Sequence, residues 1–324
     1  MDASLNIAIA AEFELCEKIA EALEESKLTI GSISIVEISP FDEEQGVRFN
    51  NKSVVQRSAQ EMDWSEINYL FFSGDVEQLA SIAIAAESGC VIIDMKGVCA
   101  ALSDVPVVVP TINEGDLVEL RQRNIVSLPD PQVSQLALAI SPVLQTTNIT
   151  QIFATSLLPA SYQNGETVSK LAGQTARLLN GIPLDDDEKR LAFDVYSQKT
   201  TALSEQFQKI FPQCNSVLFH AVQVPVFYGM AQKVTVLWDY ETDFQPQDNE
   251  LLQYHGTSIT PVINGERESG ERQVKLHINL LSAVENGMEF WTVADDQRFN
   301  LAYLAVKLLE AIYHQGYNFK EQLC

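Results

Sequence analysis

The side chains that could act as nucleophiles are few in this chain and far apart. Its five cysteines are Cys16, Cys90, Cys99, Cys214 and Cys324, and no two of them form a CxxC pair. This spacing excludes a zinc ribbon and gives no sign of a disulfide framework. Cys99 lies in the apolar stretch Gly97–Ala101. Such a setting is typical of a buried packing thiol rather than of a reactive nucleophile.

Histidine, the usual general base, gives an equally weak signal. Of the four histidines, His220 and His277 lie in patterns typical of strands. A strand histidine with one satisfied hydrogen bond is more common than a catalytic base. The chain contains no HExxH pattern, no other metal-ligand spacing and no GxSxG nucleophile elbow. The residues by themselves therefore predict a scaffold without an obvious catalytic group, and no metal site.

The turn after the first expected strand is where a doubly wound domain would bind a dinucleotide. Such a turn needs glycines, because the backbone must approach a pyrophosphate at a helix N-terminus. Here Ala10–Cys16 contains no glycine, and Glu12 and Glu14 bring negative charge to the place where phosphates would lie. No GxG and no Walker-type GK[ST] sequence occurs anywhere in the chain. The pattern favours a turn that binds no nucleotide.

A chain of 324 residues is long enough for about two domains that position these side chains. It carries 44 acidic and 21 basic residues, a formal net charge of −23. So acidic a surface repels phosphate backbones and anionic lipid, which argues against nucleic-acid and membrane partners. No apolar run approaches the ~18 residues of a membrane span, and no signal peptide is expected. We expect a reduced, cytoplasmic protein.

Short apolar runs alternate with helical patterns in the first part of the chain. Strands are expected at residues 5–10, 32–38, 69–72, 91–94 and 105–109, a small hairpin at 47–56, and helices over 15–23 and after residue 75. Strands that alternate with helices of this length predict βαβ units and a parallel sheet. The pattern indicates a Rossmann-like domain up to about residue 127.

Long strands dominate the second part. Helices are expected from near residue 132 and over 166–179, a strand at 149–156, and a further helix start at the acidic run 185–188. Strands at 216–226, 233–240, 273–281 and 289–293 then follow without a helix between each pair. This order predicts an antiparallel or mixed sheet. A final helix over residues 299–313 could return to the first domain.

Six short motifs also occur in a recognisable order. They are Asp104–Pro110, Ile112–Asn113, Ser127–Pro131 followed by Ser134–Leu136, Leu178–Pro183, Val224–Gly229 and Trp291–Asp295. Together they resemble the aspartate-semialdehyde dehydrogenase family, and more narrowly its Usg-like branch. The resemblance covers essentially the whole chain.

The resemblance implies an α/β protein with two domains. A Rossmann-like, NAD(P)-binding-type domain is expected at residues 1–127, with residues 299–324 packing back on it. An α+β catalytic and dimerisation domain with a mixed or antiparallel sheet is expected at 128–298. The family further implies a homodimer or larger assembly, NADP as cofactor, and a place in amino-acid biosynthesis. In it a cysteine thiolate attacks the aldehyde, a histidine moves the proton, and hydride passes to NADP.

The resemblance fails at the positions that carry this chemistry. The family's cysteine aligns with Pro131, its base histidine with Met230, and its substrate-orienting glutamine falls near Leu157. Proline has no nucleophile, and methionine cannot take the proton. Losing both groups removes both halves of the covalent mechanism.

The cofactor and substrate positions also differ. The family's glycine-rich turn aligns with Ala11–Glu17, so a degenerate cofactor site would involve Ala11, Glu12, Phe13 and Glu14. Its nicotinamide-contacting asparagine aligns with Asp296, and its basic substrate-carboxylate site falls near Lys275 and His277. No cofactor is expected on this basis, or NADP if the family's binding is retained.

Three hypotheses follow. The first is a catalytically inactive homologue that acts as a dimeric binding, regulatory or scaffold protein. The second is an NADP-dependent oxidoreductase that acts on an aldehyde or acyl phosphate by altered chemistry, in which His277, Lys275 or Asp296 would have to act. The third is a partner subunit that modulates an active dehydrogenase.

Overall fold

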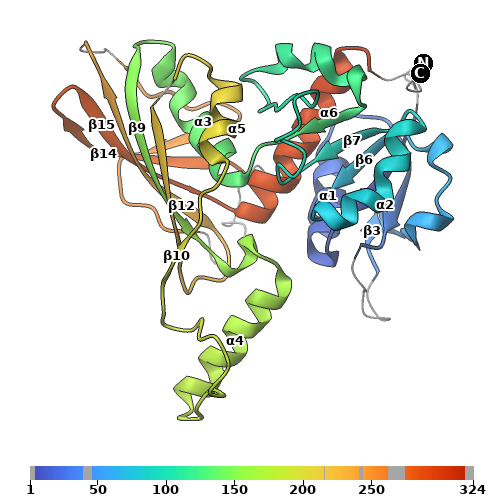
Figure 1. Cartoon of the computed structure of the whole chain (residues 1–324), viewed down its shortest axis with the longest axis horizontal. Helices are drawn as coiled ribbons and strands as arrows, with labels where there is room; N and C mark the ends of the chain where they lie inside the picture. Colours follow the sequence, from blue (N-terminus) through green and yellow to red (C-terminus); the bar gives the residue numbers. More distant parts are fainter. Residues whose placement is uncertain (1–3, 39–45, 215, 241–243, 262–273, 318–324) are drawn as a thin grey trace. The chain divides into compact units, whose positions relative to one another are not determined.

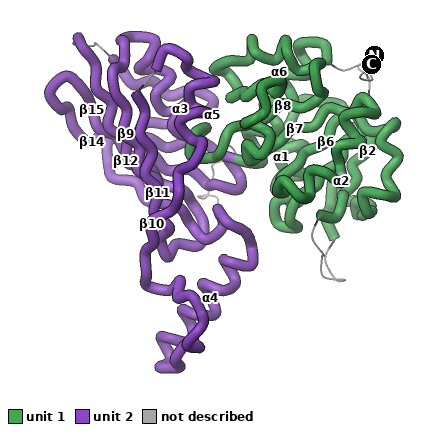
Figure 2. Tube along the Cα trace, in the orientation of Figure 1, with its two compact units in different colours: residues 1–134, 301–324 green, residues 135–300 purple. Residues whose placement is uncertain are grey.

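The computed structural model describes residues 4–38, 46–214, 216–240, 244–261 and 274–317. The chain divides into two compact units, one made of residues 1–134 with 301–324 and one of residues 135–300 (Figure 2). Gln273, Cys324 and the end of the expected C-terminal segment lie outside the described residues. The assignment of cofactor binding to residues 1–127 and of dimerisation to residues 128–298 stays a prediction about roles.

The first unit contains a six-stranded sheet with the order β5-β2-β1-β6-β7-β8. Its strands are β1 (Leu5–Ala10), β2 (Ile30–Val36), β5 (Val55–Arg57), β6 (Tyr69–Phe72), β7 (Val91–Asp94) and β8 (Ile125–Ser127). Every pairing between them is parallel. All residues of β6 and β7 are buried, which explains why these strands are nearly continuous apolar runs. The predicted parallel, Rossmann-like sheet is confirmed.

Helices of the first unit follow the expected apolar spacing. Helix α1 (Phe13–Glu25) buries Leu15, Ile19 and Leu23, which recur every four residues along one face. Helix α2 (Val76–Glu87) begins with a capping box, in which Asp75 accepts from the Gln78 amide and Gln78 from the Asp75 amide. Helix α6 (Leu304–His314) follows a π-helical segment, Asp296–Tyr303.

The remaining elements of the first unit are short. They are the hairpin strands β3 (Arg48–Phe49) and β4 (Lys52–Ser53), and the 3-10 segments Ala59–Glu61, Trp64–Glu66 and Glu114–Gln122. The hairpin turns at Asn50 and Asn51, as predicted, and both have positive φ, which asparagine tolerates better than most residues. Residues 55–57 do not continue the hairpin, because they pair with β2.

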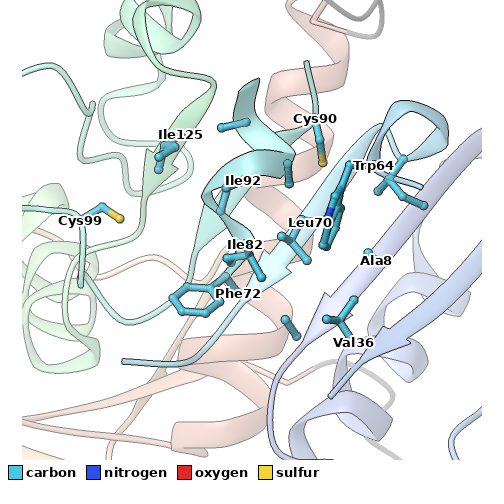
Figure 3. Close-up of a cluster of buried hydrophobic side chains, with 14 of the residues drawn as sticks. Ala8, Val36, Trp64, Leu70, Phe72, Ile82, Cys90, Ile92, Cys99 and Ile125 are labelled. Atoms are coloured by element: carbon cyan, nitrogen blue, oxygen red, sulfur yellow. The ribbon is translucent and has the colours of Figure 1, made fainter. Parts of the chain in front are cut away.

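The core of the first unit contains side chains from the sheet and from α2 (Figure 3). Leu70 and Phe72 of β6, and Ile82 of α2, are fully buried in one cluster. Cys90 and Cys99 belong to the same cluster. These two thiols therefore act as small apolar packing groups, as expected for Cys99.

The second unit contains a seven-stranded sheet with the order β10-β11-β9-β12-β15-β14-β13. Its strands are β9 (Ile149–Leu158), β10 (Tyr196–Gln198), β11 (Val217–Gln223), β12 (Met230–Trp238), β13 (Leu252–His255), β14 (Leu276–Val284) and β15 (Gly287–Ala294). The pairs β9/β11 and β13/β14 are parallel and the other pairs are antiparallel. The predicted mixed sheet is confirmed.

One face of this second sheet packs against helices, and we call it the helix-covered face. Strand register aligns Phe219, Ala154, Val234 and Phe290 across four strands, and all four are buried. Phe207 of α5 (Leu203–Ile210) packs on Phe219, with ring centroids 6.2 Å apart. Helix α3 (Pro131–Leu144) lies on the same side of the strands as α5 (Figure 1).

The other face, here called the open face, carries a polar row. His220, Thr155, Lys233 and Trp291 lie side by side across β11, β9, β12 and β15. His220 is exposed and the Lys233 side chain is 47% exposed. Alternating residues of a strand point to opposite faces, so these side chains share a face that the buried row does not.

Two expected elements differ from the structure. Residues 105–109 form only an isolated bridge between Val107 and Ser127, because Pro106 and Pro110 have no backbone N–H to donate. No helix begins at the acidic run 185–188. Glu188 instead accepts a hydrogen bond from Gln174 in helix α4 (Gly165–Leu179) and lies 3.3 Å from Arg177. Its carboxylate is thus held by helix α4 rather than placed to cap a new helix.

Candidate functional site

Pro131, aligned with the nucleophile by resemblance, is the first residue of α3. The Asp130 carboxylate accepts a hydrogen bond from the Gln132 amide at 2.8 Å, and the Asp130 carbonyl accepts from the Val133 amide. A proline suits this first position, because the amide that it lacks would have no partner within the helix. Its ring offers neither a lone pair nor a thiol, so this helix start is built for structure and not for attack on a carbonyl.

Met230, aligned with the base histidine, begins β12 and is fully buried. Its side chain packs with Leu158 and Ala221, with Tyr162 half-buried against them. A thioether is a weak acceptor that carries no exchangeable proton. The position is therefore part of the packing of the helix-covered face.

Leu157 does not share this environment. It pairs with Ala231 in β12 and with Val222 in β11. Because neighbouring residues of a strand point to opposite faces, Leu157 points to the open face while Met230 points to the helix-covered face. The structure does not bring these two positions together.

Asp296 is a buried carboxyl group held by three donors. It accepts from the Ser161 hydroxyl at 2.7 Å, from the Gly229 amide at 2.8 Å and from the Gln297 side-chain amide at 2.9 Å. Burial raises the pKa of this carboxyl, and the hydrogen bonds oppose the shift. The group joins the segments that follow β9, precede β12 and follow β15, so its evident role is to fix three chain segments.

A second buried polar chain runs beside Met230. Gln135 of α3 donates to the Thr292 hydroxyl at 2.9 Å and to the Met230 carbonyl at 3.4 Å. The Asn300 side-chain amide donates to the side-chain oxygen Oε1 of Gln135 at 3.0 Å. These three side chains are buried and carry no charge at neutral pH. They can orient a polar group, but they cannot form a nucleophile or move a proton at a rate that catalysis needs.

Lys275 and His277, expected near the substrate cleft, lie just before and at the start of β14. His277 pairs with Val293, whereas Met230 pairs with Ala294, so His277 and Met230 point to opposite faces of the sheet. Lys275 donates to the Asn249 carbonyl at 2.9 Å. Met230 and His277 therefore do not share a face, because one residue of strand register reverses it, and a substrate cleft at Lys275 and His277 stays a prediction.

The cysteines described by the structure are unsuited to act as a nucleophile. Cys16, Cys90, Cys99 and Cys214 are all buried. Burial raises the pKa of Cys16 and of Cys99 to about 12, and it also raises the pKa of Cys214. A thiol attacks as its thiolate, so none of these three is activated at neutral pH.

Comparison with known proteins shows to which family the chain belongs. It is 68% identical to the USG-1 protein homolog of Haemophilus influenzae over 317 residues, which cover 98% of this chain and all of that one. It is 30% identical to aspartate-semialdehyde dehydrogenase 2 of Vibrio cholerae over 335 aligned positions, which cover 96% and 98% of the two chains. The chain belongs to the aspartate-semialdehyde dehydrogenase family. Within this family it stands with the USG-1-like proteins.

Solved structures of aspartate-semialdehyde dehydrogenases share the fold. The Vibrio cholerae enzyme II, alone and in complex with ASA, superimposes with a TM-score of 0.83 at 27% and 28% identity. Each alignment covers 97% of this chain and 100% of that one. The Candida albicans enzyme, solved with NADP, superimposes with a TM-score of 0.67 at 11% identity, which shows the fold alone. No family model matches the chain.

The turn expected to hold the dehydrogenase family's dinucleotide does not fit one here. Ala11, at the end of β1, is fully buried, and the Cys16 thiol donates to its carbonyl at 3.4 Å. Glu14 lies in the first turn of α1, where it adds negative charge to the helix end that would meet a diphosphate. Burial and Glu21 raise the pKa of Glu17 on the same helix, which marks how acidic this region is.

Glu37 gives a further signal that the sequence analysis missed. It follows β2 directly. An acidic residue at this place in dinucleotide-binding folds bonds a ribose hydroxyl, and it opposes the additional 2′-phosphate of NADP. The strand expected at residues 32–38 placed Glu37 inside the strand, whereas β2 ends at Val36.

Two further kinds of site concern metal ions and membranes in the part of the chain that the structure describes. No group of three or more His, Cys, Asp or Glu side chains there could hold a metal ion. No helix in those residues is long and apolar enough to cross a membrane.

The buried polar residues around Asp296 and Gln135 were also missed by sequence reasoning. Ser161, Gly229, Thr292 and Asn300 are far apart in the sequence and belong to no motif that predicts a shared environment. Only strand pairing and the path of the chain after β15 bring them together. No local sequence pattern predicts such a network.

Proposed function

We propose that this chain is a non-catalytic member of the aspartate-semialdehyde dehydrogenase family, which acts in the cytoplasm as a dimeric binding, regulatory or scaffold protein. The observation that carries the proposal is the pair of substitutions at Pro131 and Met230. Proline begins α3, and a fully buried methionine packs with Leu158 and Ala221. Both places where the family's covalent chemistry would need a reactive group are thus occupied by packing groups.

The loss is large in catalytic terms. General acid–base help alone contributes about 10²–10⁴-fold to a rate, and covalent catalysis additionally requires the nucleophile. Among the described cysteines, Cys16 and Cys99 have a pKa raised to about 12. Asp296 has a raised pKa, but three donors already bind its oxygens. These observations support inactivity over an oxidoreductase of altered chemistry.

We further propose that the protein uses no dinucleotide. The support is the glycine-free turn with Glu14 in the first turn of α1. Glu37, directly after β2, additionally argues against NADP, because a carboxylate there opposes the 2′-phosphate. The opposite outcome, retention of NADP, would require another way to bind the phosphates. This protein would then be an altered enzyme or a redox sensor.

For the dimer, the partner that we propose is a second copy of this chain bound to the open face. This face presents Leu218, which is 48% exposed, beside the polar row of His220, Thr155 and Lys233. Lys233 lies 3.0 Å from Glu289 on the same face, so both charge signs are present for a self-complementary contact. A typical specific interface buries roughly 800 Å² per partner, which a seven-stranded sheet face can supply.

An activity assay tests the catalytic part. Phosphate-dependent reduction of NADP⁺ by aspartate semialdehyde is measured for the wild type and for the double variant Pro131→Cys/Met230→His. We expect no turnover by the wild type. Turnover by the wild type at a normal enzymatic rate would refute the proposal. Turnover by the double variant alone would show that the remaining site is intact and that these two residues account for the loss.

Thermal titration with NADP⁺, NADPH and NAD⁺ tests the cofactor part. A ligand at about 100 times its dissociation constant stabilises a fold by about 2.7 kcal/mol, which is a shift of several degrees. We expect no shift at millimolar cofactor. A dose-dependent shift would overturn this part and favour the oxidoreductase.

Light scattering tests the dimer part. A chain of 36.0 kDa should give twice that mass at micromolar concentration. Leu218→Glu should return it to the monomer mass. The matched control is Val118→Glu, which places the same charge at a residue that is 74% exposed in the other unit. A wild type that stays a monomer would refute the homodimer.

A further inference from the structure

Two histidines, His255 and His277, meet at the edge of the second sheet. Nε2 of His255 lies 2.9 Å from Nδ1 of His277, and the ring centroids are 5.0 Å apart. His255 ends β13, the edge strand, and His277 lies in β14, its parallel neighbour. Both side chains are half-buried. Two imidazole nitrogens therefore converge at a place that solvent can still reach.

The strand segment that carries His255 is held in place by several contacts. Asn279 donates through its side-chain amide to the His255 carbonyl at 2.9 Å. Trp291 donates through its indole N–H to the Ile259 carbonyl at 3.1 Å. Backbone pairing also aligns His255 with Asn279. Because these contacts fix the backbone that carries His255, little backbone ordering entropy is lost on binding.

We propose that His255 and His277 together bind one divalent transition-metal ion of the Ni²⁺ or Cu²⁺ kind. Two nitrogens that each lie about 2.0–2.1 Å from a metal are roughly 2.9 Å apart when the angle at the metal is 90°, and roughly 3.4 Å apart at a tetrahedral angle. The observed 2.9 Å is the hydrogen bond between the two rings, and it shows that the two nitrogens can approach closely enough to share one ion after the rings turn. Imidazole is a preferred ligand of these ions.

The change needed for binding is local. In the metal-free pair one ring donates its N–H to the other, so that ring must place its proton on its other nitrogen before both lone pairs can meet one ion. Each ring also turns about its outer side-chain torsion, which is a soft one for histidine. Water completes the coordination, because the described residues contain no group of three or more His, Cys, Asp or Glu ligands.

This inference does not rest on the proposed function. His277 points to the face of the sheet opposite to Met230, and the nitrogens concerned belong to neither the Asp296 nor the Gln135 network. A bound ion would join the edge strand β13 to β14 through two side chains. The expected consequence is a more stable sheet edge.

Titration with Ni²⁺ alone tests the site, on the full chain without an affinity tag. We expect one Ni²⁺ per chain by native mass spectrometry, reversed by a chelator. The variants His255→Gln and His277→Gln should each weaken binding by at least about 10-fold, the lower end of what altered metal sites show. The matched control His314→Gln removes an exposed histidine at the end of α6, in the other unit, and should bind as the wild type does. Equal loss in all three variants, or none in any, would overturn the proposal.

A second measurement needs no variant, should either substitution prevent folding. Ni²⁺ is paramagnetic and broadens the proton signals of the rings that bind it. With histidine labelled at its ring carbon, two of the four histidine signals should broaden first at substoichiometric Ni²⁺. Uniform broadening of all four would mean nonspecific surface binding and would refute the site. Failure of this experiment leaves the activity and cofactor assays unaffected, so the two proposals fail separately.

Discussion

The substitution Met230→His would restore the imidazole that the family resemblance places at this position. In this chain the residue is fully buried and packs with Leu158 and Ala221. Restoring the histidine therefore places a polar ring in apolar surroundings. If the position has become a packing position, the restoration should destabilise the protein instead of improving it.

The size of the effect follows from burial. A buried polar group without a partner costs about 1–3 kcal/mol. The apolar burial lost with the thioether adds on the order of 1 kcal/mol. We therefore expect Met230→His to lower the free energy of unfolding by about 2–4 kcal/mol. Met230→Leu conserves volume and apolar character, and it should cost less than about 1.5 kcal/mol.

Differential scanning calorimetry or fluorimetry measures the effect. The unit that contains Met230 spans residues 135–300. For a unit of that size, 1 kcal/mol shifts the midpoint by about 2–4 °C, so Met230→His should lower it by roughly 5–15 °C. Burial lowers the pKa of the new imidazole relative to the unfolded chain. The unfolded state then binds the extra proton, and the deficit should grow as the pH falls below about 6.5.

Two results would contradict this reasoning. One is a Met230→His midpoint equal to that of the wild type. The other is a deficit that does not change between pH 8 and pH 5.5. Either would mean that the position still accommodates a titrating base, and the inactivity proposed above would lose one of its two supports.

Three further predictions concern other residues. Burial raises the pKa of Asp296, so wild-type stability relative to Asp296→Asn should be highest below the ordinary value of 3.8 and fall as the pH rises through the folded pKa; a difference that is flat with pH contradicts this. Cys16 and Cys99, whose pKa burial raises to about 12, should resist iodoacetamide in the native protein at pH 8 and react in urea, as read by peptide mass spectrometry. Asp75→Ala removes the capping box of α2 and should cost about 0.5–2 kcal/mol of stability in chemical denaturation, with Asp75→Asn as the milder control.

Much of the fold was predictable because local patterns and tertiary structure agree. Buried parallel strands such as β6 and β7 are continuous apolar runs, and α1 repeats its apolar residues at helical spacing. Short edge elements were missed, since β10 and β13 have only three and four residues and no distinctive pattern. Their existence depends on a neighbouring strand that offers hydrogen bonds, which the sequence does not show.

The candidate site was predictable only in part. Pro131 and Met230 were identified from the sequence, because a residue type without a nucleophile or a base excludes that chemistry in any fold. That His277 and Met230 point to opposite faces was not predictable, because one step of register between Val293 and Ala294 decides which face a side chain occupies. Register is set by pairing with a distant strand.

The sequence by itself therefore determined the fold class, the residue types at Pro131 and Met230, and the glycine-free turn, because each depends on residue type and local order alone. Only the tertiary structure decided that Asp296 is held by Ser161 and Gly229, and that His255 meets His277. The physical reason is that a hydrogen bond requires atoms to approach within about 3 Å. Residues separated by many positions reach that distance only when strand pairing has fixed their register and face.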